Sequence, residues 1–169
     1  PAPDIQLALC TGIVDDHTRK NHLGHGYTLH VTLMRPKSRG QLTLQSARAQ
    51  DAPLIDPQFL ADERDLATLA RGTQLGYDIM QSPALAPYRG AMLYPFVRDD
   101  PKAVTQFLRQ HSDTEYHPCG SCKMGPASDP LAVVDSALRV HGIDRLRVVD
   151  ASVMPQVTTG NTNAPTIMI

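Results

Sequence analysis

Apolar positions in the first fifty residues predict three β-strands. Residues 5–14 are largely apolar with partial alternation, which is typical of a mostly buried strand. Residues 27–34 are rich in β-branched and aromatic side chains, and residues 41–46 alternate strictly, as in a strand with one solvated face. A polar loop at 15–26 and a turn at 35–40 separate these segments. Strands joined this closely favour an antiparallel meander.

Helical spacing replaces this pattern in the middle of the chain. Apolar side chains recur at helical intervals over 66–80, where Asp56 or Asp62 can cap the helix and Ser82-Pro83 ends it. A second helix is predicted from Asp100-Pro101 to about residue 110.

Short β-like pieces at 133–135 and 146–150 follow the second helix. Strands grouped first, then helices, then further strands indicate the α+β class, with an antiparallel sheet and helices packed on one face. A doubly wound nucleotide-binding fold is disfavoured because strands and helices do not alternate one to one.

The composition excludes several classes of partner and location. The 16 basic and 17 acidic residues balance, and the absence of a lysine or arginine run argues against a nucleic-acid partner. No apolar stretch approaches the roughly 18 residues of a membrane helix, and the start lacks a signal-peptide pattern. Three cysteines are too few for a disulfide scaffold and favour a reducing compartment, so we expect a cytoplasmic location.

The ends of the chain resemble cut ends. The chain opens at Pro1 without an initiator methionine and stops at Ile169, directly after a helix start in which Asn163 can cap and Pro165 fits the first turn. A helix of one turn has little reason to form alone, so we expect a chain that is cut at both ends.

The densest chemistry lies in residues 116–125, Tyr-His-Pro-Cys-Gly-Ser-Cys-Lys-Met-Gly. Cys119 and Cys122 have the spacing of a zinc clasp, but a structural zinc site needs four ligands and the His-x-Glu of the zinc deaminases is absent. Dithiol redox chemistry is a second alternative, although Lys-Met-Gly-Pro after the cysteines is a poor helix start. The third is that His117 works as an acid–base group and the cysteines only pack.

Residues 116–125 and 133–169 resemble the C-terminal part of the glucose–methanol–choline oxidoreductases, flavoenzymes that oxidise alcohols. The longest similar stretches are Leu-Arg-Val-Val-Asp-Ala-Ser-Val-Met-Pro at 146–155 and Thr-Gly-Asn-Thr-Asn-Ala-Pro-Thr-Ile-Met-Ile at 159–169. Residues 25–40 and Ile-Asp-Pro at 55–57 resemble the same family, so the similarity covers nearly the whole chain in order. Within the family, the choline dehydrogenase and aliphatic alcohol dehydrogenase branch is the most similar.

The resemblance implies roles for two groups of residues. His117 matches the family's catalytic histidine, and Asn161 matches a second catalytic position that is histidine or asparagine. His117 would take the alcohol proton or hold the alkoxide, while Asn161 would donate a hydrogen bond to the developing oxyanion. Five further residues match segments that lie beside the FAD cofactor in the family: Asp150, Ala151, Thr162, Asn163 and Pro165. A turn cap at Asp150 and a helix cap at Asn163 are the structural alternatives.

The family's dinucleotide-binding Gly-x-Gly-x-x-Gly is absent from this chain. The resemblance therefore implies a substrate-binding α+β domain over 1–125 and a segment at 126–169 that contributes to the flavin site.

The implied function is FAD-dependent oxidation of a primary alcohol or choline to the aldehyde. The N-terminal flavin-binding domain is the implied partner, and we expect little turnover by this chain alone. Attachment at the periphery of the inner membrane is the alternative location for the full-length enzyme. A stand-alone ligand-binding domain and a small zinc protein are the rival functions.

Overall fold

Two antiparallel strand pairs and three α-helices carry the regular structure of residues 2–169, the part of the chain that the computed structural model describes. The predicted α+β class is confirmed. The chain divides into two compact units: the first holds Pro3–Leu33 and Phe59–Asp113, and the second holds Ala2, Met34–Gln58 and Thr114–Ile169. The functional division predicted after residue 125 follows a different boundary and stays a prediction.

In the first unit, β1 (Ile5–Cys10) pairs antiparallel with β2 (Thr28–Leu33). The predicted extension of the first strand to residue 14 is wrong, because the side chain of Thr28 takes over its hydrogen bonds. Its hydroxyl accepts from the Val14 N–H at 3.0 Å and donates to the Gly12 carbonyl at 2.9 Å. Side chains along β1 alternate between half-buried and exposed, so this strand is less buried than expected.

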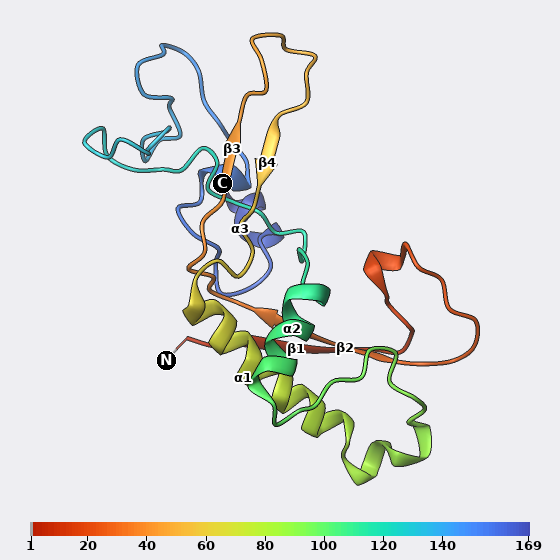
Figure 1. Cartoon of the computed structure of the whole chain (residues 1–169). Helices are drawn as coiled ribbons and strands as arrows, with labels where there is room; N and C mark the ends of the chain where they lie inside the picture. Colours follow the sequence, from red (N-terminus) through yellow and green to blue (C-terminus); the bar gives the residue numbers. More distant parts are fainter. Residues whose placement is uncertain (1) are drawn as a thin grey trace. The chain divides into compact units, whose positions relative to one another are not determined.

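Helix α1 (Glu63–Met80) lies against this strand pair (Figure 1). Of the two predicted caps, Asp62 is confirmed, since its carboxylate accepts from the Arg64 N–H at 2.9 Å. Gly72 and Gly76 stand one turn apart on the side of the helix that faces the strands. A Cβ at Gly72 would lie 3.0 Å from side-chain atoms of Ile5 and Val31, so glycine lets the backbone of the helix come close to the sheet.

Helix α2 (Pro101–His111) completes the core of this unit. Its predicted start is confirmed: the Asp100 carboxylate accepts from the Lys102 N–H at 2.9 Å, and Pro101 occupies the first turn. Between α1 and α2, the 3₁₀ helix η2 (Pro83–Tyr88) follows the predicted stop at Ser82-Pro83. The buried apolar cluster draws on both helices and on the loop before α1, and consists of Leu60, Leu66, Leu69, Val104 and Leu108.

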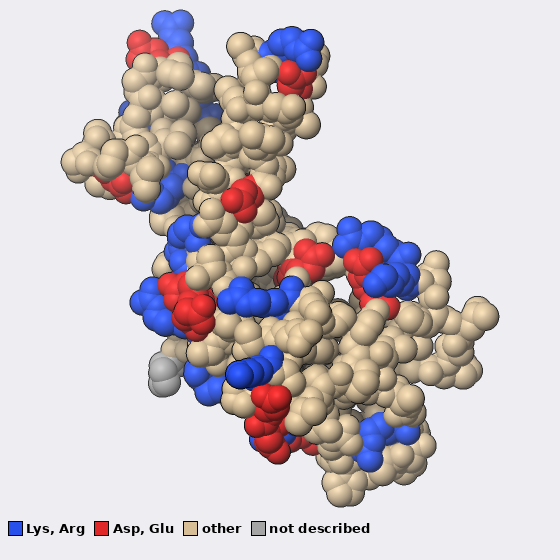
Figure 2. Space-filling model, viewed as in Figure 1, with Lys and Arg blue, Asp and Glu red and all other residues tan. Residues whose placement is uncertain are grey.

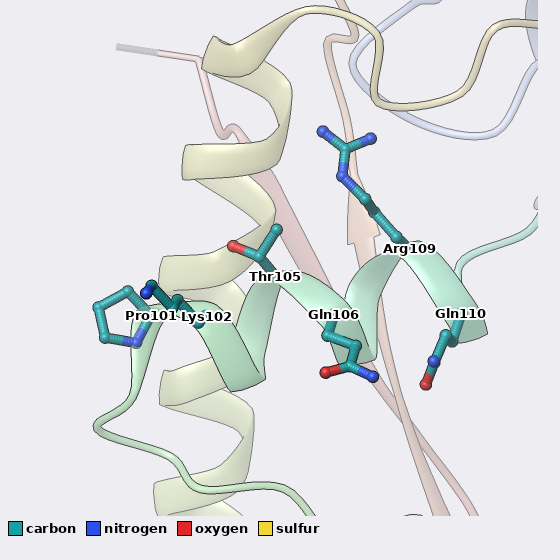
Figure 3. A pocket seen from close by; sticks show the side chains of 6 residues that line it. All are labelled: Pro101, Lys102, Thr105, Gln106, Arg109 and Gln110. Atoms are coloured by element: carbon teal, nitrogen blue, oxygen red, sulfur yellow. The ribbon is translucent and has the colours of Figure 1, made fainter.

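The other side of α2 is polar and borders an open hollow of about 560 Å³ (Figure 3). Long side chains line it from successive turns of this one helix: Pro101, Lys102, Thr105, Gln106, Arg109 and Gln110. None of these side chains belongs to the histidine–cysteine segment or to the other residues predicted for the active site.

In the second unit, β3 (Gln41–Thr43) pairs antiparallel with β4 (Leu54–Asp56). The predicted meander is wrong, because β3 joins this separate hairpin instead of the first strand pair. The hairpin is closed locally by an ion pair between Arg48 and Asp51 at 2.7 Å. Gly40 passes so close to the opposite strand that a Cβ would lie 2.2 Å from the Asp56 carbonyl oxygen.

The C-terminal part of this unit has backbone bridges where strands were expected. Val134 bridges to both Met124 and Val140, and Arg139 bridges to Arg147. The 3₁₀ helix η3 (Ala151–Val153) and helix α3 (Asn163–Met168) follow. The first unit holds one further 3₁₀ helix, η1 (Asp16–Thr18), within the predicted loop.

The predicted cap of the last helix is wrong by one residue. Thr162 precedes α3 as its cap residue, and Asn163 is the first helical residue. The carbonyl of Thr162 already accepts the Thr166 N–H at 3.0 Å, which places the start of the helix there. The predicted place of Pro165 in the first turn is confirmed.

Basic and acidic side chains are interspersed on the surface seen in Figure 2, as the balanced composition suggests. Among residues 2–169, no helix is both long and apolar enough to cross a membrane.

Candidate active site

Backbone hydrogen bonds hold the histidine–cysteine segment, residues 116–125, against η3. The N–H groups of Gly120 and Cys122 both donate to the Ser152 carbonyl at 3.0 Å, and the Met124 N–H donates to the Val153 carbonyl at 2.8 Å. Gly120 has a φ of +91°, which an L side chain rarely adopts. This backbone conformation explains why the segment needs a glycine between its two cysteines.

Two side chains brace the end of this segment, and sequence reasoning missed both. The Lys123 ammonium pairs with Asp129 at 2.6 Å, and the His141 ring lies 3.0 Å from the Gly125 carbonyl. The Lys123 contact lowers the pKa of Asp129, which keeps this carboxylate charged. A lysine six residues before an aspartate is too common a pattern to have indicated the pair.

The backbone just before His117 is in an unusual conformation. Tyr116 has a φ of +63°, in the left-handed region that non-glycine residues seldom enter. Its N–H donates to the Thr114 hydroxyl at 2.9 Å, which holds this turn in place. Residues held in such conformations gather at functional sites, so Tyr116 marks His117 as a position worth testing.

His117 contacts Thr162 across 45 residues of sequence. The Thr162 hydroxyl oxygen lies 3.1 Å from Nδ1 of the ring, and the Thr162 backbone nitrogen lies 3.5 Å from the same atom. Thr162 is 6% exposed, whereas His117 is only half-buried. The ring is therefore held on its Nδ1 side by a buried residue, which leaves Nε2 as the nitrogen available to a ligand.

Asn161 comes directly before this contact. Its peptide bond to Thr162 carries the N–H that lies against His117, so the two predicted catalytic residues belong to one neighbourhood. The Asn161 side chain is exposed and has no hydrogen bond to any residue of the described range 2–169. It is open to an external ligand, and its catalytic role stays a prediction.

The predicted cofactor residues lie in two places. Asp150 caps η3 by accepting the Ser152 N–H at 2.8 Å, which is the structural alternative considered for it. Hydrogen bonds from the Ser152 hydroxyl and N–H lower the pKa of Asp150 and keep it ionised. Ala151 is the first residue of η3, and Thr162, Asn163 and Pro165 form the start of α3. Contact of these five residues with a flavin stays a prediction.

The cysteines are free thiols. Burial raises the pKa of Cys119, which disfavours the thiolate that metal binding and dithiol chemistry both require. Within residues 2–169, no three histidine, cysteine or acidic side chains are grouped so that they could hold a metal ion. The packing role of the cysteines stays a prediction.

The histidines of the first unit have other surroundings. His22 lies 2.6 Å from the Asp15 carboxylate, a half-buried contact that sequence reasoning missed. His25 is exposed in the loop, and His30 lies within β2. A role for any of them on the substrate side stays a prediction.

A sequence profile described as GMC oxidoreductase matches residues 36–169. The chain belongs to the GMC oxidoreductase family. It is 44% identical over 169 residues to an alcohol dehydrogenase [acceptor] of Pseudomonas putida, covering 99% of this chain and 30% of that protein. It is 46% identical over 171 residues to a mitochondrial choline dehydrogenase of Mus musculus, covering 100% of this chain and 28% of that protein. The resemblance drawn from the motifs is thereby confirmed.

Solved structures of similar proteins share the fold of this GMC oxidoreductase chain. A pyridoxine 4-oxidase from Mesorbium loti superimposes with a TM-score of 0.86 at 32% identity, over 98% of this chain and 32% of that one. A formate oxidase of Aspergillus oryzae, in a study of FAD modification, superimposes with a TM-score of 0.85 at 27% identity, over 97% and 29%. The chain spans about 30% of the length of the relatives it matches.

Proposed function

We propose that the protein carrying this chain oxidises the CH–OH group of a primary alcohol or choline to the aldehyde, by hydride transfer to FAD. The single observation that carries the proposal is the contact of His117 Nδ1 with Thr162, which leaves Nε2 free and brings the ring to the residue that follows the exposed Asn161. Family membership supports the reaction class, since the similar proteins include an alcohol dehydrogenase and a choline dehydrogenase.

The chemistry at the alcohol oxygen falls to His117 and Asn161. As the hydride leaves the carbinol carbon, the oxygen must lose its proton and pass through a state with negative charge. An imidazole can receive that proton or donate a hydrogen bond to the alkoxide, and a carboxamide N–H₂ can donate a second one. Two donors aimed at one oxygen stabilise the charge where it develops.

FAD, when bound, supplies the hydride acceptor. The residues of the second unit fit one side of such a group. The Asp150 carboxylate has an oxygen beyond the one that caps η3 and can accept from a ribityl hydroxyl, and Asn163 is exposed at the start of α3. We assign residues 126–169 to this cofactor side and residues 1–125 to the substrate side. The dinucleotide would be held by a partner domain, because this chain lacks the glycine-rich motif.

Among the candidate substrates, we favour an uncharged primary alcohol over choline because the chain has few aromatic residues: no tryptophan, three phenylalanines and five tyrosines. A quaternary ammonium is bound by a cage of free aromatic faces. Here Phe96 packs on Phe107 with ring centroids 4.5 Å apart and on Tyr77 at 5.5 Å, so these rings are committed to the core. Tyr94 stacks on His111 at 4.2 Å.

The test is the substitution His117→Ala in the FAD-loaded holoenzyme that carries this chain. Turnover of a primary alcohol should fall by roughly a hundredfold or more, the scale of losing an acid–base group. Gln110→Ala, in the polar side of α2, is the control and should retain full turnover. Normal turnover by His117→Ala would refute the assignment. The isolated 169-residue chain should show no turnover.

A further inference from the structure

We propose that Thr162 is a positioning residue that sets the tautomer of His117, so that the neutral ring presents a proton on Nε2. The proposal rests on the proposed function, because it assigns Nε2 to the side of the substrate. It changes the account of Thr162, which the sequence placed only beside the cofactor.

The backbone nitrogen of Thr162 favours one tautomer. An amide N–H is a donor and never an acceptor, and it lies 3.5 Å from Nδ1, so this contact favours an Nδ1 atom without a proton in the neutral ring. The Thr162 hydroxyl, 3.1 Å from the same Nδ1, can rotate to donate as well. Both donors of one residue thus converge on one ring nitrogen, and the ring proton resides on Nε2.

The opposite tautomer meets two penalties at this position. A proton on Nδ1 would face the Thr162 N–H donor to donor. The hydroxyl would then have to accept from Nδ1, and its own proton would lose the acceptor that it has in the buried site, where Thr162 is 6% exposed. A buried donor left without a partner is costly, so both penalties favour Nε2–H.

The direction of the Thr162 N–H is fixed by the helix that follows. The Thr162 carbonyl accepts the Thr166 N–H at 3.0 Å and the Thr166 hydroxyl at 2.6 Å. These bonds hold the Thr162 backbone in place, so its N–H cannot turn away from His117 without opening the first turn of α3. Thr166 therefore helps to keep the Thr162 N–H directed toward His117.

A neutral ring with Nε2–H meets the substrate oxygen as a hydrogen-bond donor. His117 then keeps its proton and stabilises the negative charge on the oxygen, while the hydroxyl proton leaves to solvent water as the hydride leaves the carbinol carbon and the C=O bond forms. The inference thus chooses between the two roles that the residue type allows for His117, in favour of holding the oxyanion.

Three substitutions at position 162 separate the donors in the FAD-loaded holoenzyme. Thr162→Ser keeps both donors, Thr162→Val removes the hydroxyl, and Thr162→Pro removes the hydroxyl and the N–H at a φ of −80° that proline tolerates. We expect kcat near the parent value for serine and about three- to tenfold lower for valine, the scale of one hydrogen bond. Proline should lower kcat further, and KM should change little throughout.

The ¹⁵N chemical shifts of the His117 ring give a readout that does not depend on turnover. In the parent holoenzyme at a pH where the ring is neutral, Nδ1 should have the shift of a bare nitrogen and Nε2 that of a protonated one. Thr162→Pro should abolish this preference, whereas Thr162→Ser should retain it. A protonated Nδ1 in the parent would overturn the proposal.

The two proposals fail in different ways. If His117→Ala abolishes turnover while all three Thr162 variants match the parent in both kcat and ring shifts, the positioning role is wrong and the proposed function stands. If His117→Ala retains turnover, the catalytic assignment of His117 in the proposed function is wrong. The ring shifts of the parent still decide whether Thr162 sets the tautomer.

Discussion

The phenol of Tyr94 donates a hydrogen bond to the Asp15 carboxylate over 2.8 Å. The same carboxylate oxygen accepts from Nε2 of His22 at 2.6 Å, and Asp15 is 7% exposed. These contacts join the loop before β2 to the segment before α2, 79 residues later in the chain. The first unit is therefore closed by a polar cluster as well as by its apolar core.

The cluster of Asp15, His22 and Tyr94 predicts that the folding stability of the protein falls at acidic pH. Hydrogen bonds from His22 and then from Tyr94 hold the pKa of Asp15 below its ordinary value of 3.8. A carboxyl whose pKa is lowered by folding stabilises the protein above its unfolded-state pKa, and this contribution is lost as the pH falls below that value. Tyr94→Phe should lower the melting temperature by a few degrees at about pH 6 and by less at about pH 3.

Thermal denaturation of the variant at both pH values checks this expectation. Tyr88→Phe is the matched control, because Tyr88 is 76% exposed and its hydroxyl has no hydrogen bond to any residue in 2–169. An equal loss at both pH values would show that the contribution of the Tyr94 hydroxyl does not depend on the ionisation of Asp15.

The close approach of α1 to its strand pair predicts a large steric effect at Gly72. A leucine there would have its Cβ 3.0 Å from atoms of Ile5 and Val31. Gly72→Leu should destabilise the protein by about 1–3 kcal/mol or more, as overpacked cores do. Gly90→Leu is the control, since a Cβ at Gly90 meets nothing within 4 Å, and it should stay within about 0.5 kcal/mol. Urea denaturation midpoints measure both, and equal midpoints would contradict the packing of α1 described above.

Helix α2 offers a second comparison, between its two sides. Leu108 is 4% exposed in the apolar cluster, and Leu108→Ala should cost about 2–5 kcal/mol of unfolding free energy. Lys102→Ala, on the polar side seen in Figure 3, should change it by less than about 0.5 kcal/mol. The same denaturation experiment measures both. A Leu108 variant as stable as the parent would mean that α2 does not pack as described.

Asn161 gives the functional prediction that is independent of His117. If its amide donates to the developing oxyanion, Asn161→Ala in the FAD-loaded holoenzyme should lower kcat by about 10²–10³-fold. Asn161→His should restore part of this activity, because the family resemblance implies that either residue serves at this position. Steady-state kinetics with a primary alcohol measure both variants. Gln156→Ala, an exposed neighbour, is the control, and an Asn161→Ala variant that matches it would exclude the catalytic role.

Local signals in the sequence predicted local structure well. The caps at Asp62 and Asp100 and the stop at Ser82-Pro83 were predicted because each rests on residues within one helical turn. Strand partners depend on distant residues, so β3 was assigned to a sheet that it does not join, and β4 was missed. The early end of β1 was missed for the same reason, since it depends on the side chain of Thr28 on the next strand.

In the candidate site, too, the sequence predicted some features, and others depend on the fold. Motif resemblance predicts catalytic roles for His117 and Asn161, but no sequence pattern indicates that Thr162 lies against the His117 ring, 45 residues away in sequence. The shift of the helix cap from Asn163 to Thr162 has the same origin, because either residue type is a good cap and the fold decides between them. The cluster of Asp15, His22 and Tyr94 likewise exists only once the first unit has folded.

The distance in sequence between His117 and Thr162 also orders events during synthesis. At about 5–20 residues per second, a ribosome adds the threonine several seconds after the histidine. For that interval the imidazole has no partner at Nδ1 and is free to turn. A nascent chain that stalls before residue 162 would therefore keep an imidazole that no threonine holds in place.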